Sequence, residues 1–280
     1  MIRFFAKWIA RMLRKDFHAV LARAGTADVL RSLASDPRPL IVLMNHSSWW
    51  DPLIGLYLAR TLVPARPVLG PMESEQLTKF KFFRKLGIFG IDPDSPDSMN
   101  TLTSHATTRL TQSPSTAFWL TPQGEFTDVR TPVRLRPGAA AVAARLDSLH
   151  PQGCRCVVIA SELVFWIDRR PELLLNLLLI DDDSTRRAST LGWTRAMTQT
   201  MQAAADQLAT LARARDATAF DVLLGSGDGQ INWLYNLCLT LTRRSATLNA
   251  KKRTPAPQPA INRQQPAGFS TTATTHESRP

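Results

Sequence analysis

The sequence lacks the patterns that mark several large classes of protein. No apolar run reaches the roughly 20 residues that a transmembrane helix needs, and charged residues interrupt any signal-peptide core. No Gly-x-Ser-x-Gly turn precedes a helical segment, so a serine hydrolase of that type is not expected. Only three cysteines are present, an odd number without zinc-binding spacing. This usage suggests reduced thiols and a cytosolic compartment.

Candidate metal and nucleotide sites are weak. The histidines other than His46 have no companions at metal-ligand spacing; they are His18, His105, His150 and His276. The glycine-rich stretch 225–229 follows no clear strand and lacks the dinucleotide-binding pattern, so we interpret it as a linker between helices. We expect neither a metal site nor a bound cofactor.

Positive charge is concentrated at the two ends of the chain. The formal net charge is +11, from 34 basic and 23 acidic residues. Residues 1–25 hold six basic and one acidic side chain, and residues 243–280 hold seven and one. The remaining body is therefore neutral, with 21 of each sign. Because a nucleic-acid-binding domain normally carries its excess charge over the folded surface, we do not expect a nucleic-acid partner.

Residues 1–25 predict a basic amphipathic helix. Basic side chains recur at helical spacing from Arg3 to Lys15, together with an apolar face that includes Phe5, Trp8 and Ile9. Such a helix can lie in the interface of an anionic membrane. The alternative is a helix packed on the protein's own core, and both can hold at once.

The rest of the chain divides into a folded body and a tail. Residues 246–280 are rich in Pro, Ala, Gln, Thr and Ser and predict a disordered tail. Residues 26–245 are long enough for one α/β domain, a mixed and mostly parallel central sheet flanked by helices. We expect strands near 40–45, 67–70, 88–91, 115–120, 155–165 and 173–180, and helices near 3–22, 52–62, 73–85, 97–112, 138–148, 185–215 and 231–245.

The most informative stretch is residues 45–51, Asn-His-Ser-Ser-Trp-Trp-Asp, between a buried strand and a helix with proline in its first turn. His46 and Asp51 therefore lie at the carboxyl end of a strand, where open α/β sheets bind ligands. They can pair as a general base and its orienting carboxylate if the chain turns back at Ser47 and Ser48. The alternative is that Asp51 only caps the following helix.

A second segment follows the strand expected at 115–120. Its sequence, Thr-Pro-Gln-Gly-Glu-Phe-Thr over residues 121–127, contains a Pro-x-Gly turn. Such a turn exposes backbone N–H groups, which can hold a phosphate or stabilise an oxyanion. Taken alone, it is also compatible with an ordinary turn.

Together these segments resemble the glycerolipid acyltransferases, the lysophosphatidic acid acyltransferase family. The Asn-His-x4-Asp block is complete in Asn45, His46 and Asp51. The glycine-rich second block resembles residues 87–92, and the third, Phe-Pro-Glu-Gly-Thr-Arg-Ser, resembles residues 121–127. A fourth, apolar block resembles residues 157–160, and the whole resemblance covers roughly residues 35 to 180.

The chain departs from the family pattern where phosphate would bind. Pro93 and Phe126 stand where the family has arginines, Gln123 stands for its glutamate, and Ala160 for a proline. Arginine is suited to bidentate phosphate binding, so these losses leave the acceptor open between a lysophospholipid and another lipid or glycolipid hydroxyl. Nearby basic residues that can substitute are Arg130, Arg134, Arg136, Arg84 and Lys85.

The resemblance implies a membrane-associated O-acyltransferase with His46 and Asp51 as its catalytic residues. It also implies contact with the substrates by Asn45, Pro122, Gln123, Gly124, Glu125 and Gly87. The expected partners are a lipid acceptor, an acyl thioester (acyl-CoA or acyl-carrier protein, a co-substrate rather than a cofactor) and an anionic membrane surface. The expected location is peripheral, on the cytoplasmic face of the membrane. The alternatives are a thioesterase or lipase that uses water, and a non-catalytic lipid-binding relative; oligomeric state is not readable.

Overall fold

One mixed sheet organises the part of the chain that the structure, a computed structural model, describes: residues 2–150, 152–166, 168–181 and 189–225. The strands run in the order β4-β3-β5-β2-β6-β7-β1-β8. Their bounds are β1 Ala19–Arg23, β2 Leu40–Met44, β3 Val68–Glu73, β4 Ile88–Ile91, β5 Ala117–Leu120, β6 Arg155–Val164, β7 Glu172–Leu179 and β8 Phe220–Gly225. The β6–β7 and β1–β8 pairs are antiparallel and the other pairs are parallel, which confirms the expected mostly parallel sheet.

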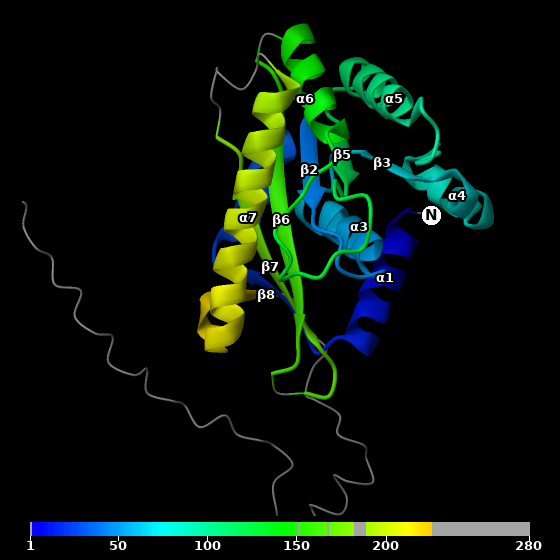
Figure 1. The fold of residues 1–280 in the computed structure, drawn as a ribbon. Coiled ribbons are helices and arrows are strands. Elements are labelled where there is room, and N and C mark those ends of the chain that lie inside the picture. Colours follow the sequence, from blue (N-terminus) through cyan, green and yellow to red (C-terminus); the bar gives the residue numbers. More distant parts are fainter. Residues whose placement is uncertain (1, 151, 167, 182–188, 226–280) are drawn as a thin grey trace, which may run out of the picture. The chain divides into compact units, whose positions relative to one another are not determined.

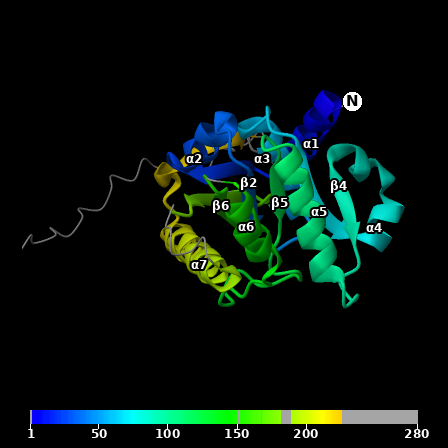
Figure 2. The ribbon, with the colours of Figure 1, turned by 90° about the horizontal axis from the view of Figure 1, so that it is seen from above.

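Helices cover both faces of the sheet (Figure 1). The α-helices are α1 Ile2–Asp16, α2 Thr26–Ser32, α3 Asp51–Leu62, α4 Ser74–Lys79, α5 Ser98–Gln112, α6 Gly138–Leu149 and α7 Thr190–Ala214, and the 3-10 helices are η1 Leu33–Ser35, η2 Lys81–Leu86 and η3 Ala217–Ala219. Seen from above, α1, α2 and α3 lie on one face, and α5, α6 and α7 on the other (Figure 2). Each group of helices packs on the sheet through its own apolar cluster.

The centre of the sheet forms because its strands are apolar on both sides. Every residue of β2, Leu-Ile-Val-Leu-Met, is buried between β5 and β6 and beneath helices on both faces. Such continuous apolar runs are typical of parallel strands covered by helices. The connections from β2 and β5 then leave in opposite directions, because β2 leads through α3 to β3 and β5 leads through α6 to β6. This divergence leaves a crevice at the carboxyl ends of β2 and β5.

The structure corrects the helix expected over residues 3–22. Helix α1 ends at Asp16, and residues 19–23 form β1, which pairs with β7 and β8. The apolar spacing around Val20 and Leu21 fits a helix locally, but these side chains are buried in the sheet. The segment that begins at residue 19 thus belongs to the folded body.

Other elements differ in detail from the sequence prediction. The helix expected over 73–85 is two shorter pieces, α4 and η2, and α2, η1, η3 and β8 were not anticipated. Helix α7, expected from residue 185, begins at Thr190, because Ser189 is extended and caps the helix by accepting the Gly192 N–H; residues 182–188 lie outside the described ranges. The helix expected at 231–245 and the tail at 246–280 also lie outside the described residues. None of the helices that are described combines the length and apolar character needed to cross a bilayer.

A network of arginines ties together the loops at the amino ends of the central strands. Asp36, just before β2, accepts hydrogen bonds from Arg38 at 2.9 and 3.0 Å and from Arg155 of β6 at 3.1 Å. The hydrogen bond from Arg38 is the main reason that the pKa of Asp36 is held well below its usual range, with Arg155 adding to it. The carboxylate therefore stabilises the fold in its charged form.

We expect Asp36→Asn to lower the free energy of unfolding at neutral pH. We also expect the variant to lose less stability than the wild type when the pH is lowered. A carboxyl whose pKa is lower when folded adds its full stabilisation above its unfolded pKa of about 3.9, and this contribution shrinks below that value and is lost as the pH falls through the lower pKa of the folded state. Urea unfolding at pH 7 and at pH 3 should show a gap between wild type and variant that narrows in acid. Asp28, an exposed residue paired with Arg31, provides the control Asp28→Asn. A gap of constant size at both pH values would contradict the prediction.

Candidate active site

The candidate site lies where the chain leaves β2 and β5, at the crevice between their diverging connections. The β2 ladder continues one residue past the strand, with the Asn45 N–H donating to the Ile159 carbonyl at 3.3 Å. At His46 the chain turns away, and it re-enters regular structure at Asp51, the first residue of α3, followed by Pro52. Between them the chain turns over Trp49 and Trp50, where the Asp51 N–H donates to the Ser48 carbonyl at 3.1 Å, so the turn lies just after the Ser47–Ser48 position expected from the sequence.

His46 and Asp51 are in direct contact. Nδ1 of His46 lies 2.9 Å from Oδ2 of Asp51, and the two side chains are 18% and 1% exposed. Because an ionised carboxylate only accepts hydrogen bonds, Nδ1 must be the donor. In the neutral imidazole, Nε2 then carries the lone pair and can accept a proton. This is the arrangement of a general base held by an orienting carboxylate.

The Asp51 carboxylate is held by the loop that precedes it. Its Oδ2 accepts the backbone N–H groups of Ser47 and Ser48, both at 2.8 Å, and Oδ1 accepts the Ser48 hydroxyl at 3.2 Å. A buried carboxylate needs such donors to remain charged. The side chain therefore faces back toward His46 and the turn. It does not cap α3, because the N-cap position is Trp50 and no side-chain capping hydrogen bond is formed there, so the alternative of a purely capping aspartate is wrong.

Asn45 anchors the same loop to β6. Its Nδ2 donates to the Ser161 carbonyl at 3.0 Å, and its Oδ1 accepts from the Ser161 N–H at 2.7 Å and hydroxyl at 3.0 Å. All polar groups of the amide side chain are directed at β6 rather than at the cavity described below. Asn45 thus positions His46, and its partner Ser161 could not be found from sequence because it lies 116 residues away.

The segment after β5 holds His46 from the other side. The His46 N–H donates to Gln123 Oε1 at 2.6 Å, and the His46 carbonyl accepts from the Thr127 N–H at 2.8 Å. Gln123 is buried and points at the His46 backbone. Because both backbone groups of His46 bind this segment, the two sequence blocks form one unit.

Gly124, Phe126 and Arg136 shape the opening beside the imidazole. The Phe126 and His46 rings lie 4.2 Å apart between centroids, and Phe126 is otherwise exposed. Gly124 has a φ of 74° and its N–H closes the turn onto the Thr121 carbonyl. A Cβ at Gly124 would lie within 2.6–2.9 Å of the Arg136 side chain, so glycine is what allows Arg136 to lie across the turn.

A cavity of about 590 Å³ opens beside the pair, and both His46 and Asp51 line it. Apolar side chains from several elements form its walls, among them Met44 of β2, Leu56 of α3, Phe83 of η2, Met99 of α5 and Trp119 of β5. Arg136 is the basic side chain in that lining, and Pro122 and Gly124 also contribute. A large apolar space with a few converging polar groups is typical of a ligand site.

Two of the sequence-predicted substrate residues lie elsewhere. Gly87 lines a second cavity of about 420 Å³ between β3, β4 and α5. Its φ is 95°, and any Cβ there would collide with the Val68 carbonyl, so it is needed for the turn into β4. Glu125 is exposed and is not among the residues that line either cavity. Asn45 and Gln123 act on the His46 loop, which leaves Pro122 and Gly124 facing the cavity.

The basic residues considered as substitutes for the missing arginines are also separated by the structure. Arg130 pairs with Asp128 at 2.6 Å, and this hydrogen-bonded pair holds the pKa of Asp128 well below its usual range. Arg84 and Lys85 belong to η2 and do not line the main cavity. Arg136 alone among the five considered lines it. Within the described ranges, no three His, Cys, Asp or Glu side chains gather in a way that could hold a metal ion.

The contact of Gln123 with the His46 backbone predicts a positioning role that can be measured. Gln123→Ala should lower kcat about tenfold or more with a smaller change in KM, because the buried His46 N–H loses its acceptor and the imidazole is no longer held in place. Gln123→Glu keeps an acceptor and should retain more activity than the alanine variant. Equal activity of the two variants, or a wild-type kcat in Gln123→Ala, would contradict this role.

The fold and the site together define an α/β protein with a histidine–aspartate base at the mouth of an apolar cavity, the arrangement of a transferase or hydrolase acting on an apolar substrate. A family model described as Acyltransferase matches residues 28–172, about half of the chain. The chain therefore belongs to the Acyltransferase family of glycerolipid acyltransferases, which confirms the resemblance seen in the sequence, and its general activity is acyl transfer. No curated protein matches the chain.

Proposed function

We propose that this protein is a membrane-associated O-acyltransferase that moves a fatty acyl group from a thioester donor to a hydroxyl of a lysophospholipid, similar to 1-acylglycerol-3-phosphate, or of a related lipid. The observation that carries the proposal is the 2.9 Å contact between His46 Nδ1 and Asp51 Oδ2 at the mouth of the apolar cavity. Family membership supports the acyl-transfer chemistry. The donor, the acceptor and the membrane are the parts we add.

In the proposed reaction, Nε2 of His46 takes the proton of the acceptor hydroxyl while that oxygen attacks the thioester carbonyl. Asp51 keeps Nδ1 protonated and stabilises the imidazolium that forms. As the tetrahedral intermediate collapses, the new C–O ester bond remains and the C–S bond breaks. The imidazolium returns its proton to the departing thiolate, which restores the neutral histidine.

The surroundings of the pair support this assignment of roles. The apolar walls of the cavity suit a fatty acyl chain. Arg136 lies across Gly124 at the cavity, where its guanidinium can bind an acceptor phosphate or the developing oxyanion. Since the Gly124 N–H is used within its own turn, we assign this electrostatic role to Arg136 rather than to that backbone group.

Membrane association is proposed from the character of α1. Ile9 and Leu13 are buried against the body, while Trp8 is exposed beside the basic residues of the helix. Tryptophan and cations on one exposed surface suit an anionic membrane interface. The helix can thus pack on the core and contact a bilayer, and we place the protein on the cytoplasmic face.

A panel of acceptors tests the proposal. The purified protein is incubated with acyl-CoA or acyl-carrier protein and with vesicles that contain a lysophosphatidic acid, a neutral lysolipid or a glycolipid, and both thiol release and new ester are measured. We expect ester to form in step with thiol for at least one acceptor. Thiol release without any acceptor would instead identify a thioesterase, and vesicle binding without turnover across the panel would identify a non-catalytic relative.

A further inference from the structure

Basic and aromatic side chains are interspersed from the last residue of α4 through η2. Residues 79–85, here called the 79–85 segment, read Lys-Phe-Lys-Phe-Phe-Arg-Lys. Phe80 and Phe82 are 50% and 42% exposed, and the four basic side chains are exposed as well. A single exposed phenylalanine needs no explanation, but two within a run of cations are characteristic of an interaction surface.

Most of this charge is not neutralised by the protein itself. Lys79 pairs with Glu75 at 2.7 Å, and Glu73 is the other acidic residue nearby in sequence. Lys81, Arg84 and Lys85 have no carboxylate partner within the described part of the chain. Their charge is therefore available to an anionic partner.

The same segment borders the cavity of the candidate active site. Phe83 lines that cavity, and the Phe82 ring stacks on the Phe83 ring with their centroids 4.2 Å apart. The segment thus has one aromatic ring in the apolar cavity and two at the surface. A lipid in contact with Phe82 would lie one ring away from the cavity wall, because Phe82 stacks on Phe83.

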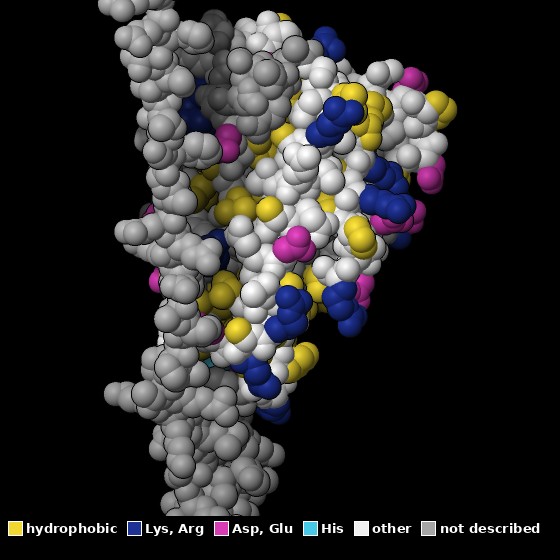
Figure 3. Space-filling model, turned by 60° about the vertical axis from the view of Figure 1, so that its left-hand side comes forward, with side chains coloured by type: hydrophobic (Ala, Val, Ile, Leu, Met, Phe, Trp, Pro, Cys, Tyr) yellow, Lys and Arg dark blue, Asp and Glu magenta, His cyan; other side chains and the backbone are white. Residues whose placement is uncertain are grey.

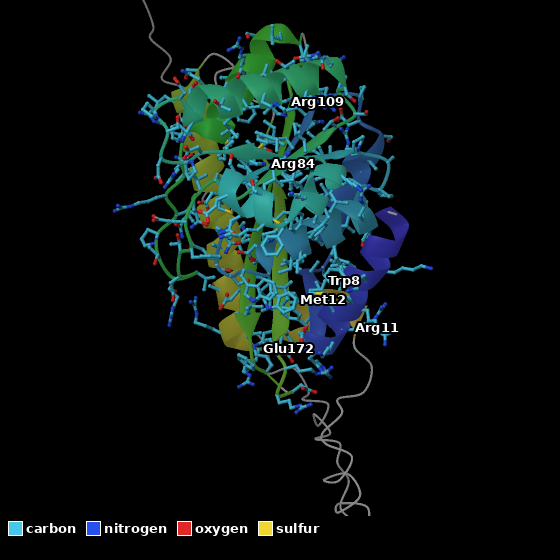
Figure 4. All side chains as sticks on the ribbon, turned by 90° about the vertical axis from the view of Figure 1, so that its right-hand side faces the viewer. Trp8, Arg11, Met12, Arg84, Arg109 and Glu172 are labelled. Carbon is cyan, nitrogen blue, oxygen red and sulfur yellow. The ribbon has the colours of Figure 1, made fainter. Side chains whose placement is uncertain are left out.

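The position of the segment agrees with a membrane on this side. Helices α1 and α4, the latter ending at Lys79 of the segment, lie on the same side of the molecule in two perpendicular views (Figures 1 and 2). Figure 4, which faces that side, labels Arg84 above Trp8, Arg11 and Met12 of α1. A different face, seen in Figure 3, shows Lys and Arg interspersed with Asp and Glu.

We propose that the 79–85 segment is a membrane-contact surface, in which Phe80 and Phe82 enter the interface of an anionic bilayer while Lys81, Arg84 and Lys85 bind its headgroups. Charge complementarity and exposed rings beside a lipid-sized cavity favour a bilayer over a protein partner. The inference deepens the proposed function, since it names the surface from which the lipid substrates would enter, and it concerns binding rather than turnover.

Vesicle binding by full-length variants tests this surface. In a His46→Ala background, which removes turnover from the measurement, cosedimentation is compared with vesicles of phosphatidylcholine alone and with added phosphatidylglycerol. Lys81→Glu/Lys85→Glu should weaken binding to the anionic vesicles about tenfold or more. Phe80→Ala should weaken it roughly fivefold, because one ring no longer enters the interface.

Two control variants separate this surface from general charge and exposure. Arg145→Glu/Arg195→Glu changes net charge equally at exposed positions of α6 and α7, and Phe165→Ala removes another exposed ring. We expect both controls to bind like the parent protein. The proposal would be overturned if each control lost as much vesicle binding as its matching 79–85 variant. It would also be overturned if both 79–85 variants bound the anionic vesicles as tightly as the parent protein. Thermal unfolding of every variant confirms that a loss of binding is not a loss of fold.

Discussion

His46→Ala is expected to reduce acyl transfer by about 10³-fold or more while leaving the fold in place. The variant removes the group that we propose takes the acceptor proton, and general-base catalysis contributes about 10²–10⁴-fold by itself. The fold should survive because the imidazole makes one side-chain hydrogen bond, to an Asp51 that keeps its donors from Ser47 and Ser48. Ester formation measures the loss of acyl transfer, and thermal unfolding of the same variant shows whether the fold is retained. Substantial residual turnover by a folded variant would refute the assignment of the base.

Asp51→Asn serves as a more selective companion variant. Three hydrogen bonds converge on Oδ2, from His46 Nδ1, the Ser47 N–H and the Ser48 N–H, so the amide oxygen of asparagine should occupy that place. Its NH2 group would then face the Ser48 hydroxyl, and His46 would keep its tautomer. What is lost is the negative charge that stabilises the imidazolium. We therefore expect a fall in kcat of about 10²-fold with little change in KM, smaller than for His46→Ala.

The central strands and the first sequence block were predictable because local sequence determines them. A continuous apolar run such as Leu40–Met44 has few alternatives to a buried strand, and Pro52 marks the start of the next helix. The separation of five positions between His46 and Asp51 excludes pairing within one helix but allows it across a turn. The sequence therefore supported a histidine–aspartate pair, and the structure places the two side chains in contact.

What the sequence could not indicate depends on pairing between distant segments. The helical spacing that begins in α1 continues to Leu21, but β1 forms because β7 and β8 are there to pair with it. The anchoring of Asn45 by Ser161 and the contact of Gln123 with the His46 backbone also join segments far apart in sequence. Among several candidate arginines, only the fold could show that Arg136 reaches the cavity.

The second large effect is expected from Arg66, which is distant from the chemistry. Arg66 is 2% exposed and lies at the amino end of the central strands. Its guanidinium donates to the carbonyls of Leu33, Asp36, Arg38, Pro114 and Ser115. These acceptors belong to the connections that precede β2 and β5, and Arg66 itself lies in the connection between α3 and β3. One side chain therefore joins three connections. Burial lowers the pKa of Arg66, while the nearby Asp36 carboxylate opposes that shift.

Arg66→Met should therefore lower the free energy of unfolding by about 4 kcal/mol, because it removes a planar fork of donors and leaves several buried carbonyls without a partner. In a body of this size that corresponds to a fall in Tm of roughly 10 °C. Arg66→Lys should recover only part of the loss, since a single ammonium with three donors cannot reach acceptors spread around a guanidinium plane. Arg145→Met, at an exposed position of α6, provides the control and should change Tm by no more than about 2 °C. Equal melting temperatures for Arg66→Met and Arg145→Met would contradict the prediction, because the loops would then not depend on Arg66. Water would in that case have to replace the hydrogen bonds that Arg66 donates.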